Sequence, residues 1–299
     1  MSICVIGEGM LELSKSGDGW MLGYGGDTLN TAIHLARLGE QVSYVTALGT
    51  DPFSAEMRQA WEAEGLATNL VLLDPASQSG LYAIRTNESG ERSFYYWRND
   101  SAARGLFSLP GIDSVLAVAA EARLLCYSLI TLAILPQAAR TQLFALCNAV
   151  RKRGGRVAFD GNYRPRLWSS PDEARSARDA AAACCDIGLP TLADEMLLSG
   201  AASAAAVAAH WSDLGAAETI VKLGAEGCLI PGGTVVAPAR VIDPVDTSGA
   251  GDAFNAGYLH ARLAGDGVSI AALAGHRLAA WVITRPGAVP GRTPDAPYA

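Results

Sequence analysis

The sequence predicts an α/β fold, with a mostly parallel central sheet covered by helices on both faces. Short apolar runs alternate along the chain with longer segments whose apolar residues recur at helical spacing, as in repeated βαβ units. Half of the 299 residues are hydrophobic, which is enough to build one large core. No linker, repeat or low-complexity stretch divides the chain, so we expect a single domain over residues 1–299.

The apolar runs predict strands, and the segments with helical spacing predict helices. The strands are expected at residues 3–6, 42–45, 123–127, 156–159, 187–189 and 219–221. The helices are expected at residues 28–38, 54–64, 173–183 and 202–214, and glycines that can cap a helix follow the first two.

Two segments interrupt this alternation, at about residues 10–24 and 80–98. The second contains two short runs of apolar and aromatic residues, at 81–85 and 92–97, on either side of a turn at residues 87–90. This pattern predicts a β-hairpin.

Charge and cysteine content exclude several classes of partner. The chain has a net charge of −7, only three lysines and no long basic cluster, so we expect no nucleic-acid partner. Its six cysteines are scattered without a C-x-x-C pair, which indicates free thiols in a reducing compartment. The chain starts with a strand-like run, and no apolar run approaches the roughly 18 residues of a membrane span. We therefore expect a soluble cytoplasmic protein without a membrane partner.

The most informative run is D-T-S-G-A-G-D-A-F-N-A-G-Y at residues 246–258, where a turn of small residues leads into a helical pattern. Gly249, Ala250 and Gly251 let the backbone close on a ligand, and the free amides at the start of the helix attract an anion. Asp252 stands beside those amides, where it can accept the proton of a hydroxyl that attacks a phosphoryl group. The run predicts a site for phosphoryl transfer.

This run resembles the C-terminal signature of the ribokinase-like (PfkB) family of carbohydrate kinases, and G-G-D-T-L-N at residues 25–30 resembles the N-terminal signature. The resemblance implies a three-layer α/β/α fold in which the two interrupting segments form a small β-sheet lid over the sugar. It also implies that Gly26, Asp27 and Asn30 bind sugar hydroxyls. Taken alone, Asp27 is more typical of a helix N-cap, and both roles can hold together.

The run V-K-L-G-A-E-G at residues 221–227 resembles the turn that the family places near its nucleotide. Lys222, Gly224 and Gly227 are therefore expected to bind ATP, together with Gly249 and Gly251. Charged residues on a turn are more often solvated than functional, which makes Lys222 the weaker assignment of the set.

T-L-A-D at residues 191–194 stands where the family carries N-x-x-E, a motif that orders metal-bound water around the phosphates. The resemblance implies dependence on Mg²⁺, and Asp194 can hold the ion through water although its side chain is one carbon shorter. It also allows a monovalent cation such as K⁺ near residues 243–246.

F-D-G-N-Y-R-P-R-L-W at residues 159–168 follows a predicted strand, so its polar side chains fall at the strand end where open α/β sheets bind ligands. Asn162 and Arg164 suit recognition of an anion, because a guanidinium binds a carboxylate or phosphate with two parallel bonds. Arg166 suits the same purpose or a plain surface ion pair.

Within the family, the chain resembles the 2-keto-3-deoxygluconate kinases most closely, at residues 7–14, 25–31, 44–51, 90–99 and 162–168. This implies transfer of the ATP γ-phosphoryl group to the 6-hydroxyl of a small acidic sugar. Tyr82, Tyr96 and Arg98 would then contact the substrate from the lid. Arg98 and Arg164 could compensate its carboxylate, which neutral sugars lack.

Three alternatives stay open at the level of sequence. The first is a fructokinase or another neutral-sugar kinase of the same family, and the second is a non-catalytic sugar or nucleotide sensor on the same fold. A nicotinamide oxidoreductase is the third, although the G-x-G at residues 7–9 lacks the third glycine of the dinucleotide motif, and no P-loop motif is present. By resemblance, the chain could form a homodimer or a higher homo-oligomer through its lid.

Overall fold

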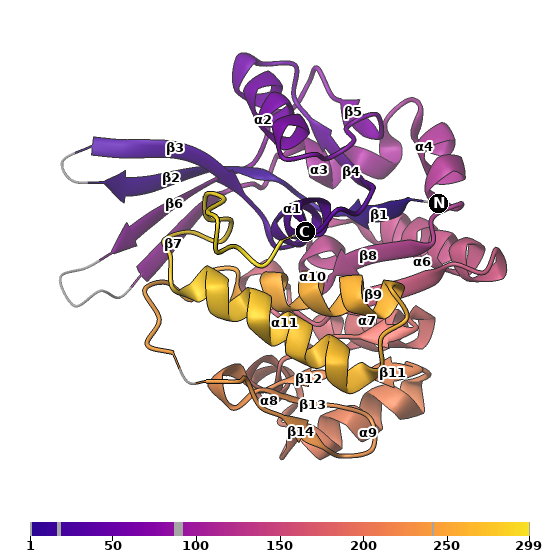
Figure 1. The fold of residues 1–299 in the computed structure, drawn as a ribbon. Helices are drawn as coiled ribbons and strands as arrows, with labels where there is room; N and C mark the ends of the chain where they lie inside the picture. The colour runs from indigo at the N-terminus through magenta and orange to yellow at the C-terminus, as the bar shows by residue number, and fades with distance from the viewer. Residues whose placement is uncertain (1, 17–18, 87–91, 241, 299) are drawn as a thin grey trace.

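The computed structural model describes residues 2–16, 19–86, 92–240 and 242–298, and it confirms the α/β class (Figure 1). Neighbouring strands of the central sheet are all parallel. In spatial order the seven strands are β11 (Glu218–Thr219), β10 (Ile187–Gly188), β9 (Arg156–Asp160), β8 (Leu124–Ser128), β1 (Ile3–Ile6), β4 (Val42–Leu48) and β5 (Val71–Leu73).

Each face of this sheet carries its own apolar core, because successive strand residues point to opposite sides. Ile3 and Val5 of β1 join one core, whereas Cys4 and Ile6 join the other. The first core includes side chains of α1 (Asp27–Arg37), α2 (Pro52–Ala63), α10 (Ala250–Leu263) and α11 (Val268–Ile283). The second includes side chains of α3 (Ala102–Gly105), α4 (Ile112–Ala119), α5 (Leu129–Ile134), α6 (Gln137–Lys152), α7 (Pro171–Cys184), α8 (Leu192–Ser199) and α9 (Ala204–Leu214). The predicted three layers are therefore present.

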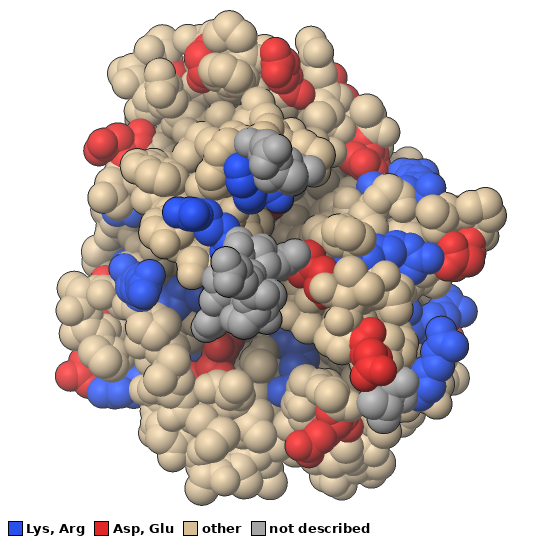
Figure 2. Space-filling model, turned by 90° about the vertical axis from the view of Figure 1, so that its left-hand side faces the viewer, with Lys and Arg blue, Asp and Glu red and all other residues tan. Residues whose placement is uncertain are grey.

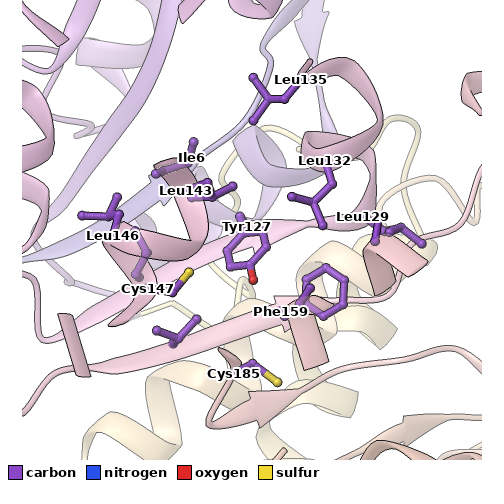
Figure 3. Close-up of a cluster of buried hydrophobic side chains, with 14 of the residues drawn as sticks. Ile6, Tyr127, Leu129, Leu132, Leu135, Leu143, Leu146, Cys147, Phe159 and Cys185 are labelled. Carbon is purple, nitrogen blue, oxygen red and sulfur yellow. The ribbon is translucent and has the colours of Figure 1, made fainter. Parts of the chain in front are cut away.

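The second core is centred on aromatic rings from β8 and β9 (Figure 3). The rings of Tyr127 and Phe159 lie with their centroids 5.2 Å apart, and α6 supplies Leu143 and Cys147 against them. All six cysteines are free, as the sequence predicts, and five of them are buried. Burial raises the pKa of the Cys185 thiol to about 12, so this thiol is unreactive at neutral pH.

The two interrupting segments pair with each other as a separate sheet that projects from the body (Figure 1). Its order is β3 (Gly19–Gly25), β2 (Met10–Ser16), β6 (Leu81–Thr86) and β7 (Arg92–Trp97). The antiparallel pairing of β6 with β7 confirms the predicted hairpin, whereas its predicted turn at residues 87–90 lies outside the described residues. We refer to β2, β3, β6 and β7 together as the four-stranded sheet.

Aromatic side chains occupy both faces of the four-stranded sheet. The rings of Tyr82, Phe94 and Tyr96 contact one another on one face. Tyr95 and Trp97 alternate with them along β7, and their side chains are 50% and 61% exposed. The opposite face of this strand therefore presents apolar surface to solvent.

Two strand predictions differ from the structure. Residues 219–221 do not form one strand, because β11 ends at Thr219 and β12 (Val221–Lys222) belongs to a small antiparallel sheet with β13 (Cys228–Leu229) and β14 (Val235–Val236). The edge strand β5 was not expected, since a three-residue strand leaves too short an apolar run to recognise.

Three helices begin two residues away from their predicted starts, and their caps explain the difference. Asp51 and Ser170 accept hydrogen bonds from backbone amides three residues later, and prolines occupy the first helical positions of α2 and α7. These two helices therefore start two residues earlier than the apolar spacing indicates. Ser203 caps α9 in the same way, which starts that helix at Ala204 instead of 202.

The segment after α11, residues 284–298, folds back over α1. The His34 ring of α1 is fully buried beneath it, with Nε2 3.0 Å from the carbonyl oxygen of Ala288 and Nδ1 2.8 Å from the Tyr298 hydroxyl. Since a carbonyl can only accept, Nε2 carries the proton and Nδ1 accepts from the hydroxyl. Arg37 adds a bond to the carbonyl of Pro290. We call residues 284–298 the C-terminal strap.

Acid is expected to loosen the strap through His34. Burial lowers the pKa of His34 from 6.5 to about 4, so the unfolded chain binds a proton between these values and the folded chain does not. The contribution of His34 to the free energy of unfolding therefore falls by about 2 kcal/mol as the pH drops from 7 to 5. Denaturant unfolding of wild type and His34→Gln at both pH values will measure it, with the exposed His210→Gln as the control. If both variants show the wild-type pH dependence, His34 does not carry the effect.

Among the described residues, no single helix has the length and apolarity that crossing a membrane requires, although two sharply bent helix pairs reach that length and composition together. Figure 2 shows the face from which the four-stranded sheet projects, where Lys and Arg side chains are interspersed with Asp and Glu outside the grey residues.

Candidate active site

The candidate site lies at the carboxyl edge of the central sheet, where β1, β8 and β9 end and where α1 and α10 begin. Ligands bind at this edge in open α/β sheets. A small cavity of about 20 Å³ opens there between side chains of several elements, among them Asp27, Thr31, Ser128, Asp160 and Asn255. The polar residues around it come from segments far apart in the sequence.

The N-terminus of α10 provides the predicted anion site. Gly249 precedes the helix with φ 69°, and a Cβ at this position would lie 2.5 Å from the Cβ of Ala288 in the strap, so only glycine fits. The first backbone bond of the helix runs from Ala253 to Gly249. The amide of Ala250 bonds to the carbonyl of Thr247, while the amides of Gly251 and Asp252 precede the helical ladder and can face an anion.

Asp252 is buried on the first turn of α10, with 8% of its surface exposed. Its Oδ2 accepts a hydrogen bond of 2.8 Å from Nδ2 of Asn30, which joins the N-terminal and C-terminal motifs across 222 residues of sequence. Burial first, and then the nearby carboxylate of Asp27, raise the pKa of Asp252 to about 8. A carboxyl with this pKa can exchange a proton with a sugar hydroxyl near neutral pH.

The N-terminal motif begins α1, and its Asn30 contacts Asp252. A Cβ on Gly26 would lie 2.3 Å from the carbonyl oxygen of Glu8, so glycine permits the close approach of two backbones. Gly26, and not Asp27, is the N-cap of α1, which corrects the N-cap interpretation of Asp27. Asp27 occupies the first helical position and accepts from Nδ2 of Asn162 at 3.1 Å. Within the described chain, Oδ1 of Asn30 is buried without a partner, so it can accept from a ligand hydroxyl.

Arg98 enters the site from the end of β7 and is 6% exposed. It forms a buried ion pair with Glu8, whose side chain is 1% exposed. Its guanidinium also lies 5.9 Å from the ring centre of Tyr96, a cation–π arrangement. Sequence reasoning missed Glu8, because the G-E-G run resembled part of a dinucleotide motif and gave no sign of its distant partner.

The hydroxyl of Tyr82, a predicted substrate contact, bonds to another side chain in the structure. The Tyr82 side chain is buried in β6, and its hydroxyl donates a hydrogen bond to Glu12 on β2. Burial and the Glu12 carboxylate raise the pKa of Tyr82. The hydroxyl is therefore occupied, and Tyr82 offers mainly its ring, 5.9 Å from that of Tyr96.

Arg164 and Asp194 lie together, and Asp194 interacts with Asp160, which lines the cavity. Nη1 of Arg164 is 3.6 Å from Oδ1 of Asp194, and the Arg164 side chain is half exposed. Burial, and more weakly the carboxylate of Asp160, raise the pKa of Asp194. A carboxylate held this way favours a cation nearby, which fits an indirect contact to Mg²⁺. In the described parts of the chain, no group of three or more His, Cys, Asp or Glu side chains could hold a metal ion directly.

Lys222 is not a solvated turn residue, since it is 8% exposed at the end of β12. Its Nζ lies 2.8 Å from Oδ1 of Asp160 and 3.1 Å from Oδ1 of Asn255. Sequence reasoning did not assign Asp160 or Asn255 to the site. Their signals were a carboxylate at the end of a strand and an amide three residues after Asp252.

The predicted nucleotide turn follows Lys222 directly. Gly224 begins a short 3₁₀ turn, η3 (Gly224–Glu226), and Gly227 leads into β13, both with positive φ. The other 3₁₀ segments are η1 (Leu106–Ser108) and η2 (Pro165–Leu167). Gly224 is exposed with open space at its Cβ position, whereas Gly227 is buried against the backbone of Val236, so only the start of the turn is open to a ligand.

Comparisons with known proteins agree with this arrangement. The pattern of the pfkB family carbohydrate kinases matches residues 2–296. The 2-dehydro-3-deoxygluconokinase of Dickeya dadantii is 44% identical over 298 residues, and that of Escherichia coli K12 is 42% identical over 297, each match covering 96% of both chains. The fructokinase of Vibrio cholerae O395, solved with fructose, ADP and calcium, superposes with a TM-score of 0.83 at 26% identity, covering 97% of this chain and 95% of that one. The chain belongs to the pfkB family of carbohydrate kinases.

Proposed function

We propose that the protein transfers the γ-phosphoryl group of ATP to the 6-hydroxyl of 2-keto-3-deoxygluconate. The observation that carries the proposal is the position of Asp252, a buried carboxyl with a pKa of about 8 beside the free amides of α10. Relatives named 2-dehydro-3-deoxygluconokinase at 42–44% identity support the choice of substrate.

In the proposed reaction, Asp252 accepts the proton of the sugar hydroxyl while Asn30 holds its carboxylate in place. The amides of Gly251 and Asp252 stabilise charge on the transferring phosphoryl group, as donors already aligned before reaction. ATP lies along the turn of Gly224 and Gly227. Mg²⁺, when bound to the phosphates, supplies the further positive charge that a site rich in carboxylates lacks.

The sugar lies between α1 and the four-stranded sheet in this proposal. Gly26, Asp27 and Asn30 bind its hydroxyls from below, and the Tyr96 ring and Arg98 contact it from the sheet. The whole chain then works as one kinase domain with the four-stranded sheet as its lid, which would exclude water and limit ATP hydrolysis.

We also propose self-association through the lid, because exposed apolar side chains cover its outer face, with Tyr95 and Trp97 among them. Sedimentation of the purified wild type and of Trp97→Ser will test this. We expect the wild type to associate and the variant to associate less, and a monomeric wild type would contradict the proposal. Six free thiols fit a cytoplasmic location, where ATP is also available.

A neutral-sugar kinase remains the second candidate, and one observation favours it. The buried carboxylate of Glu8 already compensates Arg98, which reduces the net charge offered to a substrate carboxylate. The fructokinase from Vibrio cholerae shares the fold closely.

The two candidates predict different substrates. ADP release with Mg-ATP is expected for 2-keto-3-deoxygluconate and at most weakly for fructose, ribose or adenosine. The control is the matching sugar lacking the carboxylate, 3-deoxyglucosone, which keeps the 2-keto-3-deoxy arrangement. Turnover of fructose above that of the keto acid would overturn the proposed substrate while leaving the phosphoryl chemistry intact.

A further inference from the structure

Three side chains in the site form a closed ring of hydrogen bonds. Nζ of Lys222 donates to Oδ1 of Asp160 at 2.8 Å and to Oδ1 of Asn255 at 3.1 Å. Nδ2 of Asn255 donates to Oδ2 of Asp160 at 2.9 Å, which closes the ring. Each side chain comes from a different element, namely β12, β9 and α10. The ring therefore fixes the position of the ammonium relative to the start of α10.

The ring places the Lys222 ammonium at the predicted anion site. A Cβ built on Gly251 would lie 3.7 Å from Nζ of Lys222, which is the nearest described atom outside the adjoining residues and the backbone of α10 itself. Asn255 follows Asp252 by one helical turn on α10, so Lys222 reaches the same helix that carries the base. The ammonium thus lies near Gly251, whose amide would hold the transferring phosphoryl group.

The ammonium retains bonding capacity for a ligand. It has three N–H donors, and among the described residues it makes two hydrogen bonds. Both oxygens of Asp160 and both polar atoms of Asn255 are used within the ring. The third N–H of Lys222 is a charged donor that this ring leaves open, and a phosphoryl oxygen beside Gly251 could accept from it.

Charge and burial support the same assignment. Lys222 is 8% exposed, and an unpaired ammonium at this burial would destabilise the fold. In the protein without ligand, the carboxylate of Asp160 balances its charge. Asp252 faces Asp27, Asp160, Lys222 and the amide of Asn30. The Asp160 carboxylate raises the pKa of Asp252, and the Lys222 ammonium lowers it. The ring is therefore electrostatically coupled to the base.

We propose that Lys222 is a catalytic residue that donates to the transferring phosphoryl group, and that Asp160 and Asn255 are positioning residues that hold it beside Gly251. This places Lys222 at the reacting centre and not along the nucleotide. The inference rests on the proposed phosphoryl transfer, but it does not depend on which sugar is the acceptor.

The test compares Lys222→Met, Lys222→Arg and Asp160→Asn with wild type, on whichever sugar the wild type phosphorylates. Lys152→Met, an exposed lysine on α6, is the control. We expect Lys222→Met to lower kcat by about 10²–10³-fold, as loss of one aligned donor to developing charge does, with the KM for ATP changed less than about threefold. Asp160→Asn should lower kcat less, because the ammonium remains.

The pH profile separates positioning from general disruption. Asp160→Asn removes a charge that raises the pKa of Asp252, so its rate profile should move to lower pH. Lys222→Met removes a charge that lowers that pKa, so its profile should move to higher pH. Opposite shifts support the proposal, and shifts in the same direction, or none, contradict it.

Two results would overturn the role of Lys222. The first is a kcat close to wild type in Lys222→Met with a raised KM for ATP, which would make Lys222 a ground-state nucleotide ligand. The second applies if Lys222→Met does not fold, when full wild-type kcat with an unshifted pH profile in Asp160→Asn would show that the ring does not position the ammonium for catalysis. A wild type that phosphorylates only neutral sugars would defeat the proposed substrate and leave this comparison unchanged.

Discussion

Replacement of Asp252 by asparagine is expected to lower kcat by at least about 10²–10⁴-fold, the usual contribution of a general base. Asparagine cannot accept the hydroxyl proton, yet it is nearly isosteric and can still accept the hydrogen bond from Asn30. Because the pKa of Asp252 is about 8, the folded protein already holds this carboxyl protonated at neutral pH. The neutral substitution should therefore preserve folding and ATP binding.

The wild-type pH dependence provides a second readout for Asp252. The base must lose its proton before it can act, so kcat/KM should rise with pH through an apparent pKa near 8. Asp252→Asn should lack this rise. Steady-state kinetics between pH 6 and 9 will show both effects, with Asp113→Asn, an exposed acid on the first turn of α4, as the control. Wild-type turnover in Asp252→Asn would remove the residue from catalysis.

The second large effect is expected at the Glu8–Arg98 ion pair. Removing Arg98 alone would leave the buried carboxylate of Glu8 unpaired, at a cost of about 3–5 kcal/mol in stability. The double variant Glu8→Gln with Arg98→Gln removes both charges together and avoids this penalty. It should raise the KM for the keto acid about 10–100-fold, as loss of a charge-assisted hydrogen bond does, and leave the KM for ATP unchanged.

Three comparisons assign that effect. Glu8→Gln alone keeps the guanidinium, so it tests whether Arg98 needs its partner to bind the substrate. Arg164→Ala tests the other cation that could compensate the carboxylate, and its half-exposed side chain should give the smaller rise in KM. A double variant that binds the keto acid as wild type does would place substrate recognition elsewhere.

The parts of the site that were predictable are those in which function depends on contiguous residues. Gly249 to Asp252 is such a run, because one turn supplies both the amides and the carboxyl. The α/β class was equally predictable, since alternating strands and helices give the sequence alternating short apolar runs and segments of helical spacing. The starts of α2 and α7 were not predicted correctly, because Asp51 and Ser170 cap these helices before the apolar pattern begins.

Side-chain partners between distant segments could not be predicted. Lys222 and Asp160 are 62 residues apart, and Glu8 and Arg98 are 90 apart, so nothing local identifies either pair. Asp27 illustrates the same limit, because its sequence position suited a cap and the fold gave that position to Gly26. The pairing of polar side chains depends on how the helices and strands pack, and this packing depends on the whole core.

The C-terminal strap also orders the events of biosynthesis. Residues 284–298 contact His34 and Arg37 on α1, and Ala288 packs against Gly249. Ribosomes make α1 early and the strap after everything that it touches. Ala288 therefore cannot pack against Gly249 until the strap has emerged from the ribosome. We expect a nascent chain whose strap is still inside the ribosome to be inactive.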